Sequence, residues 1–125
     1  MYIIRYATPA GDKKPGGNIM EDFKNVKLVA KANVYEGGKV TSRTFYTPEG
    51  DRKTLGFMMA GTYSFGTGAP EVMEMLAGDM DVKLPGETEY HNYKAGDSYS
   101  IPGNSSFDII VKEWVDYCCS YADPK

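Results

Sequence analysis

The chain has 125 residues, enough for one domain with one hydrophobic core. Its formal net charge is −3 and it has no basic stripe, which excludes a nucleic-acid-binding protein, because phosphate binding needs clustered Lys and Arg. The first residues lack the apolar core of a signal peptide and no apolar run reaches membrane-spanning length, so we expect a cytoplasmic protein without a membrane partner.

Residues 1–33 have a mixed pattern that differs from the rest of the chain. A short strand-like piece, YIIRY, is followed by the polar loop GDKKPGG and by a segment, residues 19–34, that fits either a helical turn or a strand. This part is too small to form a core of its own. We expect an N-terminal extension, residues 1–33, that packs on a domain formed by residues 34–125.

From Tyr35 onwards the pattern is that of an all-β domain. Alternating segments at residues 40–46 and 105–113 are separated by turns rich in Gly, Pro and Asp, and such turns recur about every 8–12 residues. We expect a bulge or bend at Gly61, the end of a strand at Gly78, and a separate last strand over residues 114–121. This spacing predicts a single-domain barrel or sandwich.

The two cysteines of the chain, Cys118 and Cys119, are neighbours in sequence. In a strand their side chains point to opposite faces, and a disulfide between adjacent residues is strained. We therefore expect reduced thiols, with one of them packed. Two thiols without a nearby histidine make a poor metal site.

Two segments between Gly61 and Phe107 have the spacing of the cupin signatures, which place three histidines and a glutamate around a metal in a small β-barrel. The glutamate position is Glu71, whereas the histidine positions hold Phe65, Thr67 and Phe107. Phenylalanine has no lone pair, and one carboxylate cannot select a transition metal. The resemblance therefore implies a cupin-like barrel, or small jelly roll, with no metal and no cofactor. The only histidine, His91, lies outside both signatures, and we expect it at the surface.

A more specific resemblance covers about residues 34–121. The segments GTYSF, PEVMEMLAG and YKAGDSYSIPGNSSF, with the closing Tyr-Cys pattern DYCCSY, resemble the cupin-type pyrimidine/purine nucleoside phosphorylases. The resemblance implies an enzyme that converts purine and pyrimidine nucleosides and phosphate into free base and ribose 1-phosphate, with a broad base range.

Phosphorolysis requires a group that binds phosphate and a group that stabilises an oxocarbenium-like ribose. Arg52 follows the turn at Gly50 and Asp51, where we expect a mobile loop, and its guanidinium suits phosphate oxygens. Glu71 is the candidate catalytic residue, because strand alternation places it on the same face as Met73 and Met75. A solvated loop arginine and a structural carboxylate remain the alternatives.

Six further residues complete the predicted substrate site. Broad base tolerance follows if aromatic rings supply most of the binding, because every base has a π-face. The candidate walls are Tyr63, Phe65, Tyr99 and Phe107, and the candidate donors at the barrel mouth are Asn104 and Ser105. Ordinary core aromatics and ordinary turn residues are the alternatives.

Three functions remain open from the sequence. The first is the phosphorylase, and the second is a non-catalytic cupin that binds a nucleoside, a sugar or another small metabolite. The third is a structural protein whose pocket is filled by Phe65 and Phe107. In each case we expect a homodimer, because strand edges of small barrels are commonly paired.

Overall fold

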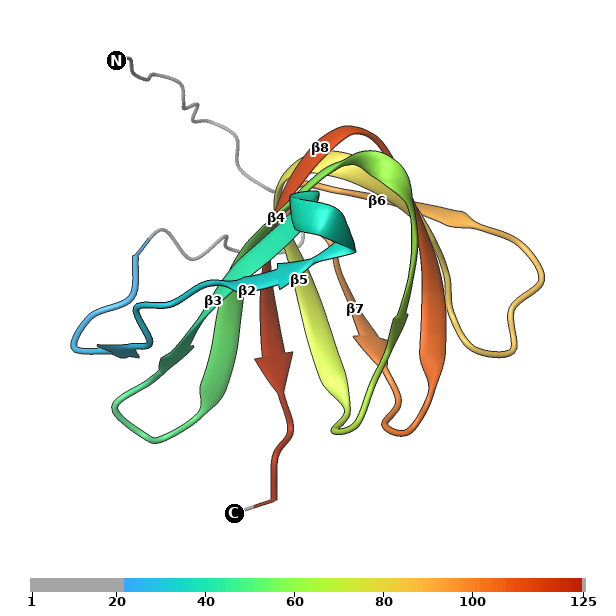
Figure 1. Cartoon of the computed structure of the whole chain (residues 1–125). Helices are drawn as coiled ribbons and strands as arrows, with labels where there is room; N and C mark the ends of the chain where they lie inside the picture. The colour runs from blue at the N-terminus through green and yellow to red at the C-terminus, as the bar shows by residue number, and fades with distance from the viewer. Residues whose placement is uncertain (1–21, 125) are drawn as a thin grey trace.

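The computed structural model describes residues 22–124, which form one curled antiparallel sheet (Figure 1). The predicted strand YIIRY and the loop after it lie outside the described residues. The strands are β1 (Lys27–Leu28), β2 (Asn33–Tyr35), β3 (Val40–Tyr46), β4 (Arg52–Gly66), β5 (Glu71–Lys83), β6 (His91–Lys94), β7 (Ser98–Ile101) and β8 (Ser106–Tyr121), with a short 3-10 turn, η1 (Glu36–Gly38), after β2. No helix among residues 22–124 is long and apolar enough to cross a membrane.

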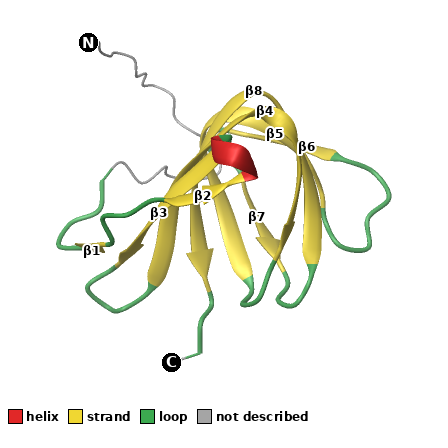
Figure 2. Ribbon diagram, viewed as in Figure 1, coloured by secondary structure: helices red, strands yellow, loops and turns green. Residues whose placement is uncertain are grey.

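The three longest strands lie side by side at the centre of the sheet. The strand order is β1-β3-β4-β8-β5-β6, and β2 pairs with β3 while β7 pairs with β5. The long strands bend over and form the top of the molecule, so that the sheet folds back toward itself (Figure 2). The predicted all-β fold is confirmed, although the described strands form a curled sheet and not a closed barrel.

Bulges where β8 pairs with β4 and with β5 contribute to this curvature. The pairing register between β4 and β8 shifts between Met59 and Gly61, as the sequence predicted for Gly61. The register between β5 and β8 shifts twice, on either side of Gly78. A bulge adds twist and bends the strand that carries it.

Two predicted strand ends are wrong. Gly78 does not end a strand: it lies inside β5 with a φ of 83°, and an added Cβ would collide with the backbone oxygen of Trp114 on β8. Glycine is needed there because the strand bends while remaining paired. Likewise β8 continues through Trp114, since both of its neighbours pair with it on each side of the bend.

The inner face of the sheet holds the core. Because strand side chains alternate, every second side chain of a long strand points inward, and these inward side chains are mostly apolar and buried. These residues are mainly aliphatic and Met side chains: Val40, Met58, Met73, Met75, Met80, Val82, Ile109, Val111 and Val115.

Candidate active site

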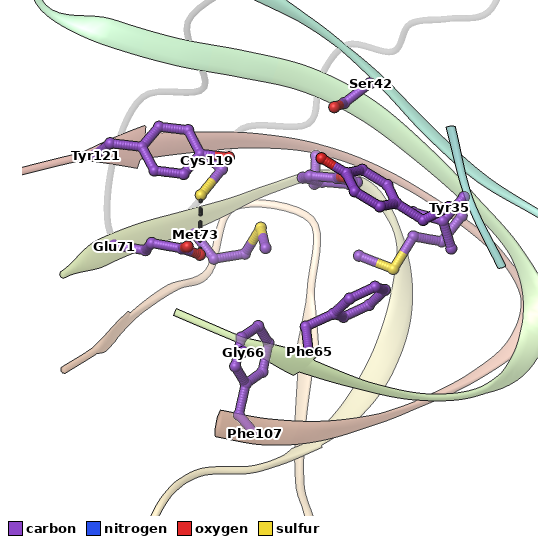
Figure 3. A pocket seen from close by; sticks show the side chains of 12 residues that line it. Tyr35, Ser42, Phe65, Gly66, Glu71, Met73, Phe107, Cys119 and Tyr121 are labelled. Atoms are coloured by element: carbon purple, nitrogen blue, oxygen red, sulfur yellow. Dashed lines mark hydrogen bonds between the residues drawn. The ribbon is translucent and has the colours of Figure 1, made fainter. Parts of the chain in front are cut away.

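A cavity of about 130 Å³ lies on the inner face of the sheet, between the bent strands (Figure 3). Strands β3, β4, β5 and β8 supply most of its walls, and the last residue of β2 supplies one more. The lining residues are Tyr35, Val40, Ser42, Met58, Phe65, Gly66, Glu71, Met73, Phe107, Tyr117, Cys119 and Tyr121.

One end of the cavity is polar and centres on Glu71. This residue begins β5, and its side chain points inward with those of Met73 and Met75, as predicted from alternation. The thiol of Cys119, on the neighbouring strand β8, donates a hydrogen bond to Glu71 Oε1, with 3.3 Å between sulfur and oxygen. Partial burial raises the pKa of Glu71, whereas the Cys119 hydrogen bond and the charge of Arg52 lower it. The carboxyl group therefore sits in a site that resists its ionisation.

Tyr121 connects Cys119, the partner of this carboxyl group, to the start of β4. Its hydroxyl lies 3.2 Å from the hydroxyl of Thr54, which is only 3% exposed. Burial raises the pKa of Tyr121, so the hydroxyl remains protonated at neutral pH. The polar end thus contains hydrogen-bond donors as well as the carboxyl group.

Arg52 lies on the same inner face, next to the ring of Tyr121. The guanidinium carbon is 3.8 Å from the ring centroid, and Nε and Nη2 donate to the two carboxylate oxygens of Asp123 at 2.7 and 2.9 Å. Arg52 does not line the cavity itself; the Tyr121 ring does. The predicted loop position is wrong, because Arg52 begins β4 and pairs with Tyr46. The hydrogen bond that Arg52 donates to Asp123 is the main cause that raises the pKa of Arg52.

The other end of the cavity is aromatic. Phe65 and Phe107 both line it, and their ring centroids are 6.2 Å apart at an angle of 47°. Tyr35 and Phe65 pack edge to face, with 6.3 Å between their ring centroids. These two phenylalanines stand where a cupin would carry histidine ligands. Because open space remains beside them, the pair does not fill the pocket.

Tyr63 and Tyr99 lie behind these rings and do not line the cavity. Tyr63 is 4% exposed, stacks on Phe65 at 5.9 Å, and donates its hydroxyl to the Met59 backbone oxygen at 2.6 Å. Tyr99 is 6% exposed, and its ring centroid lies 6.5 Å from that of Phe107. Among the described residues the Tyr99 hydroxyl has no hydrogen-bond partner.

Asn104 and Ser105 belong to a turn that is fastened to the loop after β4. The backbone nitrogen of Asn104 donates to the Gly68 oxygen at 3.0 Å, and that of Ser105 donates to the Thr67 hydroxyl at 3.0 Å. Asn104 has a φ of 51°, which asparagine tolerates better than most residues. Neither side chain lines the cavity, although the turn lies beside Gly66, which does.

Sequence reasoning missed Cys119, Tyr121, Tyr35 and Ser42 as members of the site. Alternation puts Cys119 and Tyr121 on one face of a strand, but only the pairing of β8 with β5 brings them to Glu71. Both cysteines are free, as predicted, and both are buried, where the sequence predicted one packed thiol.

The described part of the chain contains no group of three or more His, Cys, Asp or Glu side chains that could hold a metal ion. His91 lies on β6 with 55% of its side chain exposed, as predicted.

Comparison with known proteins assigns this arrangement to a family. The family model for pyrimidine/purine nucleoside phosphorylase matches residues 30–121. The chain belongs to this family. It is similar to the pyrimidine/purine nucleoside phosphorylase of Clostridioides difficile (strain 630), with 59% identity over 102 residues, which is 82% of this chain and 97% of the relative. The corresponding protein of Hydrogenovibrio crunogenus is 56% identical over 104 residues, covering 83% of this chain and all (100%) of the relative.

Solved structures of other proteins have a similar fold. A protein of unknown function from Acinetobacter sp. ADP1 is 38% identical and superposes with a TM-score of 0.78, over 80% of this chain and 97% of that one. An RmlC-like cupin from Shewanella frigidimarina superposes with a TM-score of 0.58 at 13% identity, over 82% of this chain and 90% of that one. At that identity the likeness concerns the fold alone, and the fold is cupin-like.

Proposed function

We propose that this chain is a metal-independent nucleoside phosphorylase that cleaves purine and pyrimidine nucleosides with phosphate, giving free base and ribose 1-phosphate. The observation that carries the proposal is the composition of the cavity: a partly buried carboxyl group faces aromatic rings where a cupin has metal ligands. The relatives from Clostridioides difficile and Hydrogenovibrio crunogenus are pyrimidine/purine nucleoside phosphorylases by name, which supports the same reaction.

The base occupies the aromatic end in this proposal. Phe65 and Phe107 offer ring faces and no hydrogen-bonding group, so they bind purines and pyrimidines without reading base edges. Tyr63 and Tyr99 enter the site indirectly, because their rings hold the two phenylalanines in place. Asn104 and Ser105 contribute the turn beside Gly66, which can offer donors to a substrate that protrudes from the cavity.

Glu71 acts on the ribose. Breaking the bond between C1′ and the base nitrogen develops positive charge on the sugar ring, and a fixed carboxylate stabilises that charge. The ribose hydroxyl groups are natural donors to the same carboxylate, which compensates for its partial burial.

Phosphate binds at Arg52 in this proposal. The two carboxylate oxygens of Asp123 already accept hydrogen bonds from the guanidinium fork, in the bidentate geometry that two phosphate oxygens also adopt. The ring of Tyr121 lies between Arg52 and the cavity, so this proposal requires phosphate to replace Asp123 on the guanidinium and the Tyr121 ring to move aside.

The test is release of base from uridine and adenosine by the purified full-length chain, with and without phosphate. We expect both bases to be released only with phosphate, with one ribose 1-phosphate formed for each base. Saturable nucleoside binding without release would instead favour the non-catalytic cupin.

We also propose that the chain works as a homodimer in the cytoplasm. The dimer is supported by apolar side chains on the outer face of β4 and β8, where Phe57 and Trp114 stack at 5.6 Å and are 42% and 45% exposed. Light scattering after size exclusion tests it, and a monomeric mass at micromolar concentration would contradict it.

A further inference from the structure

The adjacent residues Cys118 and Cys119 serve different parts of the molecule. Both are buried, at 1% and 2% exposure, and both are free thiols. Because strand side chains alternate, Cys119 points into the cavity beside Glu71 while Cys118 points to the opposite face of the sheet. Only one of the two thiols can therefore influence the proposed catalytic carboxylate.

The geometry fixes the direction of the hydrogen bond between Cys119 and Glu71. The sulfur lies 3.3 Å from Oε1, and an ionised carboxylate can only accept, so the thiol donates. One carboxylate oxygen is thus held by β8 while the residue itself is held by β5, and the second oxygen remains for a substrate. Two anchoring strands restrict the rotation of a side chain that would otherwise have three free torsions.

The thiol is suited to this role because it stays protonated. Burial raises the pKa of Cys119, and the nearby charge of Glu71 raises it further. A nucleophilic cysteine needs the opposite, a thiolate stabilised by positive charge. Cys119 is therefore a donor at neutral pH.

We propose that Cys119 is a positioning residue: its thiol orients the Glu71 carboxylate toward the ribose and favours its ionised form. The inference rests on the proposed function for the catalytic role of Glu71, but not for the hydrogen bond itself. Two groups act on the pKa of Glu71, Arg52 of β4 through its charge and Cys119 of β8 through its hydrogen bond. The charge of Glu71 in turn raises the pKa values of Tyr99 on β7 and of Tyr117, Cys119 and Tyr121 on β8. Of these, the thiol is the one that donates directly to Oε1.

The experiment compares Cys119→Ala, Cys119→Ser and Cys118→Ala in the full-length protein. The two alanine variants lose the same buried sulfur, so a general packing defect affects both. If Glu71 must be ionised, activity falls on the acid side as Glu71 is protonated. Removing the donor removes one cause that lowers the pKa of Glu71, so the acid limb of kcat/KM in Cys119→Ala should move up by roughly half to one pH unit.

Cys119→Ser retains a donor and should restore the acid limb to the wild-type position or below it. Cys118→Ala should show the wild-type pH profile. An unchanged profile in Cys119→Ala, or an equal shift in Cys118→Ala, would overturn the inference.

A second readout does not depend on turnover. Titration of Glu71 by carbon NMR on glutamate-labelled protein, with its resonance assigned by its loss in Glu71→Gln, should show a higher pKa in Cys119→Ala. If the wild type proved to have no phosphorolysis, the proposed function would fail while this titration would still decide the inference. A Glu71 titration identical in wild type and Cys119→Ala would overturn it.

Discussion

The two ends of the cavity are built from the same strands but offer opposite chemistry. At the polar end, β5 and β8 bring together Glu71, Cys119 and Tyr121, and Arg52 of β4 lies behind the Tyr121 ring. The Cys119 thiol donates a hydrogen bond to Glu71. At the aromatic end, Phe65 and Phe107 meet at 6.2 Å, and the cavity side presents ring faces. A nucleoside has the same division, with a flat base at one end and a hydroxylated sugar at the other.

In the proposed function, this difference lets a cupin-like fold work without its usual metal ligands. The phenylalanines at two ligand positions would bind the base by stacking, whereas the glutamate position keeps its carboxyl group. We therefore propose that base tolerance belongs to one end and bond cleavage to the other.

Glu71→Gln should remove the catalytic contribution of the polar end. We expect kcat to fall by about 10²–10³-fold, because the variant keeps the shape but loses the charge that stabilises the ribose cation. Initial rates at saturating nucleoside and phosphate test this. A kcat within about twofold of wild type would assign Glu71 a structural role only.

The same variant should be more stable at neutral pH. The folded-state pKa of Glu71 is raised, so its protonated form favours folding, and this contribution is lost as the pH rises through that pKa. At pH 7 the wild type carries the cost of a partly buried charge, which Glu71→Gln removes. Thermal unfolding should show a higher Tm for the variant at pH 7 and a smaller difference below about pH 4. A lower Tm at pH 7 would contradict the burial argument.

Arg52→Ala should affect phosphate specifically. Loss of a bidentate charged contact is expected to raise the phosphate KM by about 10–100-fold and to leave the nucleoside KM nearly unchanged. Lys53→Ala is the matched control, since Lys53 is adjacent but donates to Ser120 at 2.6 Å on the opposite face. Equal changes in both KM values would remove Arg52 from the phosphate site.

Phe65→Leu should affect the nucleoside instead. The substitution keeps most of the side-chain volume but removes the ring face, so the nucleoside KM should rise about 5–10-fold for uridine and adenosine alike. Phe57→Leu, on the outer face, is the control and should leave KM unchanged. A strong effect on only one base would mean that Phe65 selects between bases.

Tyr99→Phe should have the smallest effect. Its hydroxyl is buried without a partner among the described residues, so its removal should raise the free energy of unfolding by up to about 1 kcal/mol and leave kinetics near wild type. Tyr63→Phe is the contrasting variant, because its hydroxyl donates to Met59, and it should lose about 1 kcal/mol. A loss of activity in Tyr99→Phe would place its hydroxyl on the substrate.

The sequence predicted the parts of the fold that depend on local pattern. Alternation placed Glu71 on the inner face, and a glycine within a strand-forming run marked the bulge at Gly61. The predicted strand end at Gly78 was wrong, because a glycine that ends a strand and a glycine that bends a strand look alike in sequence. Only the close approach of the Trp114 backbone distinguishes them.

The site was predicted in part for the same reason. Phe65, Glu71 and Phe107 could be found because the spacing of known signatures identifies them. Cys119 could not, because its contact with Glu71 spans 48 residues and depends on the register between β5 and β8. Local pattern gives the face of a strand, but pairing decides which side chains meet.

The most direct test of the division between the two ends is one two-substrate kinetic experiment. Initial rates are measured over a grid of uridine and phosphate concentrations for wild type, Arg52→Ala, Phe65→Leu and the double variant. We predict a crossed result: Arg52→Ala raises only the phosphate KM, Phe65→Leu raises only the uridine KM, and the double variant shows both changes independently. If either single variant raised both KM values by similar factors, the assignment of phosphate and base to separate ends would be wrong.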